Sequence, residues 1–263
     1  MTSPSGSTRR AVLLAAGSAL LAACGHRVLR SAGTPAPSAS AGTASARSLA
    51  PASPTTAQAT RGPAQVVRHA TTGRPEVALT FHGSGEPRLA EQLLSEAENA
   101  GVAVTVFAVG TWLQSHPEMA ARILKGGHAL GNHTYTHPTL HRLSPAGIAD
   151  EVNRCATLLH KLTGSAGVAF RPSGGPSITA PMVQAATAAK YPYVVGFDVD
   201  PSDYLDPGAR AVASRVLAGV RPGSIVSLHL GHTGTVEALP HILDGLRSRG
   251  LRPVTTPRLL AHA

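Results

Sequence analysis

The chain has 263 residues, of which 43% are hydrophobic, and a formal net charge of +9 at pH 7. This length fits one globular domain with extensions better than two domains. Six of the 23 basic residues and none of the 14 acidic residues precede residue 62, so the rest of the chain is close to neutral. The remainder therefore lacks the basic stripe of a nucleic-acid binder, and we expect no nucleic-acid partner.

Residues 1–24 have the pattern of a bacterial export signal. A pair of arginines at residues 9–10 precedes an apolar run over residues 11–23, which is shorter than the ~20 residues of a membrane-spanning helix. The arginine pair resembles a twin-arginine signal, and the sequence LAAC at residues 21–24 resembles a lipobox. We expect lipidation of Cys24 to anchor the exported protein at the outer face of the cytoplasmic membrane; the alternative is an ordinary signal peptide with an incidental cysteine.

Residues 25–65 are expected to form a disordered tether. Ala, Ser, Thr, Pro and Gly dominate from residue 31 onward, with almost no bulky apolar side chain to offset the entropy of ordering. The folded domain is therefore expected over residues 66–263.

Within this domain, short apolar segments alternate with helical patterns. Strands are expected at residues 76–81, 102–109, 128–132, 168–170, 193–198, 224–229 and 251–255. Helices are expected at residues 89–100, 117–125, 145–163, 180–189, 210–218 and within 236–249. Cys155 lies on the apolar stripe of the helix over 145–163, so we interpret it as a buried core thiol. Alternation of this kind predicts a parallel sheet, either open or closed into a barrel, with the functional site at the carboxyl ends of the strands.

Polar motifs lie at the ends of five of these strands. Their sequences are TFHGSG (80–85), GNHTYTH (131–137), FRPSGG (170–175), DVDPSDY (198–204) and SLHLG (227–231). Their order and spacing resemble the polysaccharide deacetylase family, also described as the NodB-homology domain or carbohydrate esterase family 4. The resemblance covers essentially all of residues 66–263. It implies an α/β fold with a distorted, incomplete (β/α) barrel, and removal of acetyl groups from N-acetylated sugars by attack of water bound to a divalent metal, often zinc.

The resemblance also implies roles for individual residues. His133 and His137 match the metal-ligating histidines, and imidazole is a good ligand for zinc. Arg171 matches the arginine that orients the catalytic base, and backbone N–H groups near Gly174 match the oxyanion site. His229 matches the general acid that protonates the departing amine. Asp200 matches the carboxylate that holds that histidine.

The first motif departs from the family pattern. Relatives usually have two adjacent aspartates, of which the first is the base and the second the third metal ligand. Here His82 and Gly83 occupy those places. His82 can serve as the base, because imidazole titrates near neutrality, or as the third ligand, but not readily as both. Ser84 and Glu86 are further possible contributors.

Three functions follow from these observations. The first is a metal-dependent deacetylase acting on a cell-envelope polysaccharide, in particular peptidoglycan. The second is a glycan-binding protein on the same fold, which has lost catalysis through the change at residues 82–83. The third is an esterase that acts on O-acetyl groups, because attack by the same activated water suits both bonds.

Overall fold

The computed structural model describes residues 62–261, and within them strands and helices alternate as the sequence predicts. The strands are β1 (Gln65–Val67), β2 (Glu76–Gly83), β3 (Thr105–Ala108), β4 (Ala129–Asn132), β5 (Ala169–Phe170), β6 (Tyr193–Val195), β7 (Ile225–His229) and β8 (Arg252–Pro253). The helices are α1 (Pro87–Asn99), α2 (Gly110–Ser115), α3 (Glu118–Lys125), α4 (Pro145–Thr163), α5 (Ala180–Ala188), α6 (Ala209–Gly219), α7 (Thr233–Ser248) and α8 (Thr256–Leu260). Short 3-10 helices lie at Leu140–Arg142 and Asp203–Leu205.

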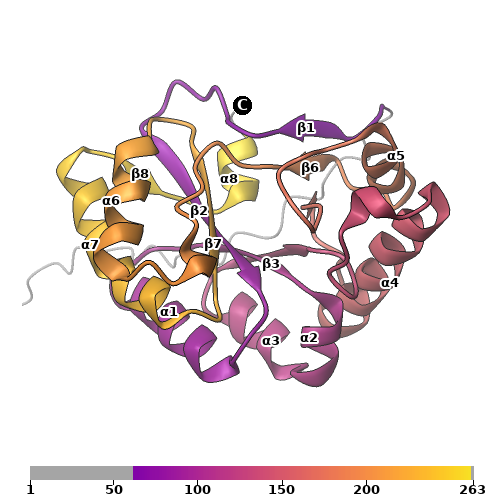
Figure 1. The fold of residues 1–263 in the computed structure, drawn as a ribbon, viewed down its shortest axis with the longest axis horizontal. Coiled ribbons are helices and arrows are strands. Elements are labelled where there is room, and N and C mark those ends of the chain that lie inside the picture. The colour runs from indigo at the N-terminus through magenta and orange to yellow at the C-terminus, as the bar shows by residue number, and fades with distance from the viewer. Residues whose placement is uncertain (1–61, 262–263) are drawn as a thin grey trace, which may run out of the picture. The chain divides into compact units, whose positions relative to one another are not determined.

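All these strands belong to one sheet of parallel pairs, in the order β1-β6-β5-β4-β3-β2-β7, with β8 pairing with β2. The sheet curls, and helices surround its outer side (Figure 1). This confirms the predicted alternation and parallel sheet. None of the helices in residues 62–261 is both long and apolar enough to cross a membrane.

The inner face of β2 is apolar at Ala78 and polar at Thr80 and His82. Because side chains alternate between the two faces, Ala78, Thr80 and His82 point to the same side. Ala78 packs in an apolar cluster with Leu259 and Leu260 of α8, which fills the amino-terminal end of the curled sheet. His82 lies at the carboxyl-terminal end, so this apolar cluster and His82 occupy opposite ends of the same interior.

Helix α4 has the limits predicted from its apolar stripe and its flanking residues. Ser144 caps its amino terminus by accepting a hydrogen bond from the backbone of Gly147, and Gly164 ends it with a φ of 77°. Cys155 is fully buried on its apolar face, as predicted.

Strand β1 and helices α2 and α8 were not predicted from the sequence. Each is at most six residues long, which is too short to show a periodic pattern. The export signal, Cys24 and residues 25–61 of the expected tether lie outside the described residues. Residues 62–65, also assigned to the tether, are described: Ala64 is buried and its N–H donates to Thr187 Oγ1 at 2.8 Å. The packed part of the chain thus begins slightly before the expected boundary.

Candidate functional site

Three histidines converge at the carboxyl ends of neighbouring strands. His82 comes from β2, whereas His133 and His137 come from the loop that follows β4. One possible ligand atom from each lies within 4.8 Å of those of the other two. The Nε2 atoms of His133 and His137 are only 3.2 Å apart. Two zinc-bound nitrogens in a tetrahedral site would be about 3.3 Å apart, given Zn–N bonds of 2.0–2.1 Å, so this pair fits a metal.

Buried polar groups hold the loop that carries His133 and His137. The side chain of Asn132 accepts from the N–H of Thr134 at 2.8 Å and donates to the Val152 carbonyl at 2.9 Å. Glu151 of α4 accepts from the backbone N–H groups of Tyr135 and Thr136 at 2.8 and 2.7 Å, and from the Thr136 hydroxyl. Glu151 was missed by the sequence analysis; its signal was a carboxylate at a buried position of α4.

His133 is oriented as a metal ligand. Its Nδ1 lies 2.9 Å from the carbonyl oxygen of Arg171, so Nδ1 carries the proton and donates it. The Nε2 lone pair is therefore directed at His137 and His82. Ligating histidines commonly have this kind of outer hydrogen bond, which fixes the ring and its tautomer.

Burial keeps these imidazoles neutral. It is the main cause that holds the pKa of His133 well below its usual value, with His137 adding to the effect. Burial likewise lowers the pKa of His82 well below its usual value, followed by the influence of His133 and Arg171. The pKa of His137 is also lowered, by burial and then by His229. Neutral imidazole is the form that binds a metal, so the cluster is ready for one at neutral pH.

Arg171 is almost fully buried, with 1% of its surface exposed. Its guanidinium donates to Thr80 Oγ1 at 2.7 Å and to the carbonyls of Val195 and Gly196, and it stacks on the Phe107 ring at 4.2 Å. Burial lowers its pKa to about 9. Among residues 62–261, Arg171 has no ion-pair partner, and it makes no hydrogen bond to His82. Arg171 therefore does not orient His82 by a direct hydrogen bond.

The carboxylate that holds His229 is Asp203, and the prediction of Asp200 for this role was wrong. Asp203 Oδ1 accepts from His229 Nδ1 at 2.8 Å, and Oδ2 accepts from the His229 N–H and the Thr235 hydroxyl. Asp200 instead accepts from the N–H of Ser202 at 2.8 Å. The reason is local: Ser202 has a φ of 54°, and this turn leads into the 3-10 helix that carries Asp203 inward, where it is 1% exposed.

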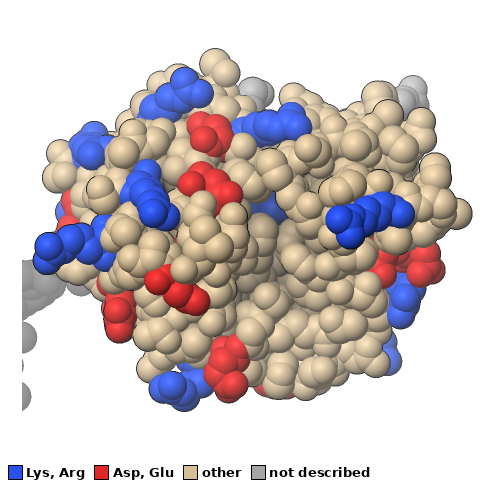
Figure 2. All heavy atoms as spheres, in the orientation of Figure 1, with Lys and Arg blue, Asp and Glu red and all other residues tan. Residues whose placement is uncertain are grey.

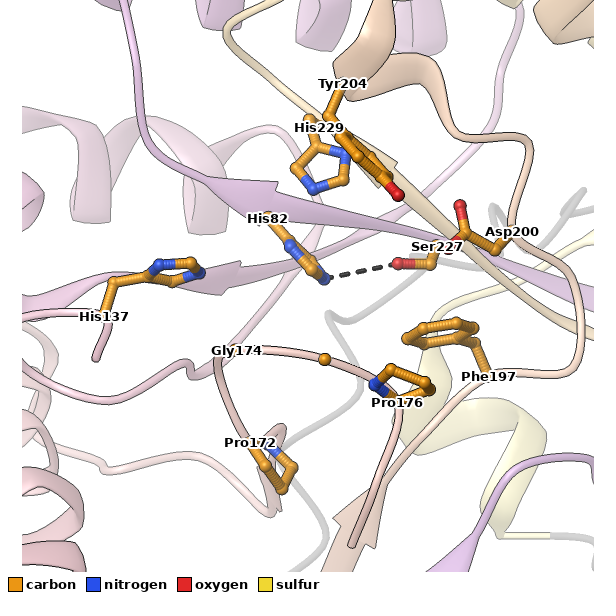
Figure 3. A pocket seen from close by; sticks show the side chains of 11 residues that line it. His82, His137, Pro172, Gly174, Pro176, Phe197, Asp200, Tyr204, Ser227 and His229 are labelled. Carbon is orange, nitrogen blue, oxygen red and sulfur yellow. Dashed lines mark hydrogen bonds between the residues drawn. The ribbon is translucent and has the colours of Figure 1, made fainter. Parts of the chain in front are cut away.

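His82 and His229 are neighbours because β2 and β7 are in register. His82 pairs with His229, and Thr80 pairs with Ser227, so all four side chains share one face. The ring centroids of His82 and His229 are 4.3 Å apart, and His82 Nε2 lies 3.3 Å from the Ser227 hydroxyl. Figure 3 shows Ser227 and His137 on opposite sides of the His82 ring.

A cavity of about 280 Å³ opens in front of these side chains. Its lining includes His82, His137 and His229, the apolar surfaces of Phe197 and Pro176, and Tyr204, which is 47% exposed. Asp200 and Gly174 lie on its wall (Figure 3). Figure 2 shows a hollow near the middle of this face with mostly uncharged walls and charged side chains around it. The cavity thus combines apolar surface with imidazole, phenol and carboxylate groups, which suits a polar ligand with apolar patches.

Comparisons with known proteins agree with this geometry. A family model described as polysaccharide deacetylase matches residues 69–194. A chitooligosaccharide deacetylase from Bradyrhizobium sp. is 32% identical over 202 residues, which cover 71% of this chain and 91% of the relative. A peptidoglycan-N-acetylglucosamine deacetylase from Bacillus cereus is 30% identical over 190 residues, 71% of this chain and 68% of the relative.

Among solved structures, a CE4 family pseudoenzyme from Bacillus anthracis superposes with a TM-score of 0.71 at 25% identity, over 76% of this chain and 69% of that one. A mutant of that pseudoenzyme is described as having restored enzymatic activity. These similarities confirm the predicted distorted (β/α) barrel.

Proposed function

Because this chain belongs to the polysaccharide deacetylase family, we propose that it is a metal-dependent deacetylase that removes acetyl groups from N-acetylated sugars of a cell-envelope polysaccharide, with peptidoglycan as the substrate. The observation that carries this proposal is that His137, which contacts His133, and His229, which is held by Asp203, line the same cavity. The names of the chitooligosaccharide and peptidoglycan relatives support the substrate class.

His133 and His137 would hold the cation, and zinc is one of the cations that neutral imidazole binds well. When bound, a divalent cation acts as a Lewis acid that activates water and polarises the acetyl carbonyl.

His229 and Asp203 provide the proton for the leaving group. Asp203 accepts a hydrogen bond from Nδ1–H of His229, which fixes the tautomer and stabilises the charged imidazolium. Nε2 of His229 can then donate a proton to the sugar nitrogen as the amide C–N bond breaks. The products are acetate and a free amino sugar, with one water consumed.

The cavity walls position the substrate. Phe197 and Pro176 offer apolar surface for the acetyl methyl group and the sugar ring. Tyr204 lies edge-on to His229, with ring centroids 5.4 Å apart, and its exposed ring borders the entrance.

The proposal is tested by measuring acetate release from N-acetylglucosamine oligomers, peptidoglycan and an O-acetylated glycan. We expect release from the N-acetylated substrates, loss of release after chelation, and recovery when zinc or cobalt is added. Release from the O-acetylated glycan alone would assign the protein as an esterase. No release from any substrate with any metal would refute catalysis.

A glycan-binding protein without catalysis is the second candidate. It is favoured by the structural similarity to a pseudoenzyme and by the lack of a carboxylate in the histidine cluster of the described residues. Under this alternative, glycan affinity would persist after chelation and in a His133→Ala variant, with no acetate released.

We also propose that the protein is exported and anchored through Cys24. The apolar run before this cysteine, which ends in small residues directly ahead of it, supports this location. Incorporation of a tagged fatty acid into the wild type but not into a Cys24→Ala variant is the expected result, and equal membrane retention of both proteins would contradict it.

A further inference from the structure

We propose that His82 is the third ligand of the metal, so that the site is made of three histidines and His82 does not act as the base. This inference rests on the proposed function, because it specifies the metal site of the same reaction. It departs from the family pattern, in which a carboxylate supplies the third protein ligand.

No side chain fits at the position of the family's third ligand in this protein. By the resemblance described above, that position is Gly83. A Cβ atom at Gly83 would lie 2.7 Å from Val106 Cγ1 and 2.9 Å from the Cα of Ala108 in β3. Real Cβ atoms essentially never come this close to backbone atoms, so a side chain here would force β2 and β3 apart. The third donor must therefore come from another residue.

No carboxylate of the described residues takes that place. Asp203 is engaged by His229 and Thr235, and Glu151 accepts three hydrogen bonds from the loop. Asp200 is exposed and accepts from Ser202, and Glu86 is exposed just before α1. Within residues 62–261, the cluster with ligand spacing contains His82, His133 and His137 alone.

The surroundings of His82 fit a ligand better than a base. Its ring centroid is 4.2 Å from that of His133, and its Nε2 lies 3.3 Å from the Ser227 hydroxyl. One ring nitrogen therefore has an outer hydrogen-bond partner, which leaves the other for a metal, as is usual for ligating histidines. The guanidinium of Arg171 donates to Thr80 rather than to His82, so no arginine among residues 62–261 holds His82 in the way that one would hold a basic carboxylate.

Three neutral imidazoles with an open coordination position are a known arrangement for catalytic zinc. In this arrangement the His82 lone pair is committed to the cation. The ring of His229 is 4.3 Å from that of His82, and its Nδ1 is hydrogen-bonded to Asp203. His229 Nε2 therefore faces the substrate without being a metal ligand.

The test is a titration of the metal-free full chain with Co²⁺, followed by its visible absorption, with Zn²⁺ competition to obtain affinities. We expect one tightly bound equivalent in the wild type, with the strong absorption of low-coordinate cobalt. In His82→Ala the affinity should fall by more than about 100-fold, since even an outer-shell loss costs 10–100-fold. His229→Ala is the matched control. The His229 ring lies as close to the His82 ring (4.3 Å) as the His133 ring does (4.2 Å), but His229 is not a proposed ligand. The cobalt affinity of His229→Ala should therefore equal that of the wild type.

The outcomes separate this inference from the proposed function. If His82→Ala binds Co²⁺ like the wild type but no longer releases acetate, His82 is the base, so the inference fails and the deacetylase proposal stands. If the wild type binds no cation, both fail. His82→Asn serves as a second variant should the alanine variant unfold, and cobalt affinity equal to the wild type in that folded variant would also overturn the inference.

Discussion

Replacing Asp203 by asparagine should reduce turnover far more than the same change at Asp200. Asp203 is buried and accepts three hydrogen bonds, from the ring and the backbone of His229 and from Thr235. An asparagine that keeps its oxygen towards the backbone N–H presents an NH₂ group to His229 Nδ1. That nitrogen must then act as an acceptor, and the charged imidazolium loses its partner.

The magnitude follows from the bond that is lost. A hydrogen bond to a charged group contributes about 1.5–3 kcal/mol, which corresponds to roughly 10–100-fold in rate at about 1.4 kcal/mol per decade. General acid catalysis as a whole contributes about 10²–10⁴-fold. Because His229 itself is retained, we expect kcat for acetate release from an N-acetylglucosamine oligomer to fall by about 10–100-fold in Asp203→Asn, with unchanged cobalt affinity.

Asp200→Asn is the matched control. Its described hydrogen bond is to the N–H of Ser202, and its side chain is exposed at the cavity wall. We expect its kcat to stay within about tenfold of the wild type, since an exposed contact contributes about 1 kcal/mol or less. A loss in Asp200→Asn equal to or larger than that in Asp203→Asn would refute the assignment of the pair.

Three further predictions concern stability, the loop and the core thiol. Burial lowers the pKa of His82 and His133 in the folded protein, so the unfolded chain binds more protons than the folded chain as the pH falls. Below about pH 6.5, the metal-free protein should therefore lose up to about 1.4 kcal/mol of unfolding free energy per pH unit for each of these groups. An unfolding free energy from urea denaturation that stays constant between about pH 7.5 and 5.5 would contradict this. Glu151→Ala should destabilise the protein by about 2–4 kcal/mol and weaken cobalt binding by about 10–100-fold, because the loop that carries His133 and His137 loses three hydrogen bonds. Glu151→Gln is the control, and its thermal melting and cobalt titration should be close to those of the wild type. Burial raises the pKa of Cys155 to about 12, so mass spectrometry should find it unmodified by iodoacetamide in the folded protein and modified in urea; rapid modification of the folded protein would contradict its burial.

The sequence predicts the parts of the fold that have a period or a stop signal. Helix α4 has both, with an apolar stripe between Ser144 and Gly164, and its limits agree with the structure. Strand β1 has neither: it has three residues, and Val66 is exposed, so its place beside β6 depends on pairing that is distant in sequence. Helix α2 follows β3 directly, and its buried Trp112 and Leu113 extend the apolar run of that strand, which conceals the boundary.

The same distinction applies to the site. His82, His133, His137 and His229 could be named from the sequence because their motifs resemble those of the family. Each also lies at or just beyond the carboxyl end of a strand, where the ends of parallel strands meet. Asp203 could not be distinguished from Asp200, since both lie in one loop and the choice depends on the left-handed turn at Ser202. The role of Glu151 depends on a contact between α4 and the loop after β4, which no local pattern reveals.

The most direct test of the whole account is to follow acetate release from an N-acetylglucosamine oligomer while zinc is added stepwise to the metal-free protein. We predict that turnover rises with the first equivalent, levels off at one zinc per chain, and is abolished in His133→Ala. Turnover that persists in the chelated protein, or in His133→Ala at saturating zinc, would contradict the claim that a metal held by this histidine cluster drives the reaction.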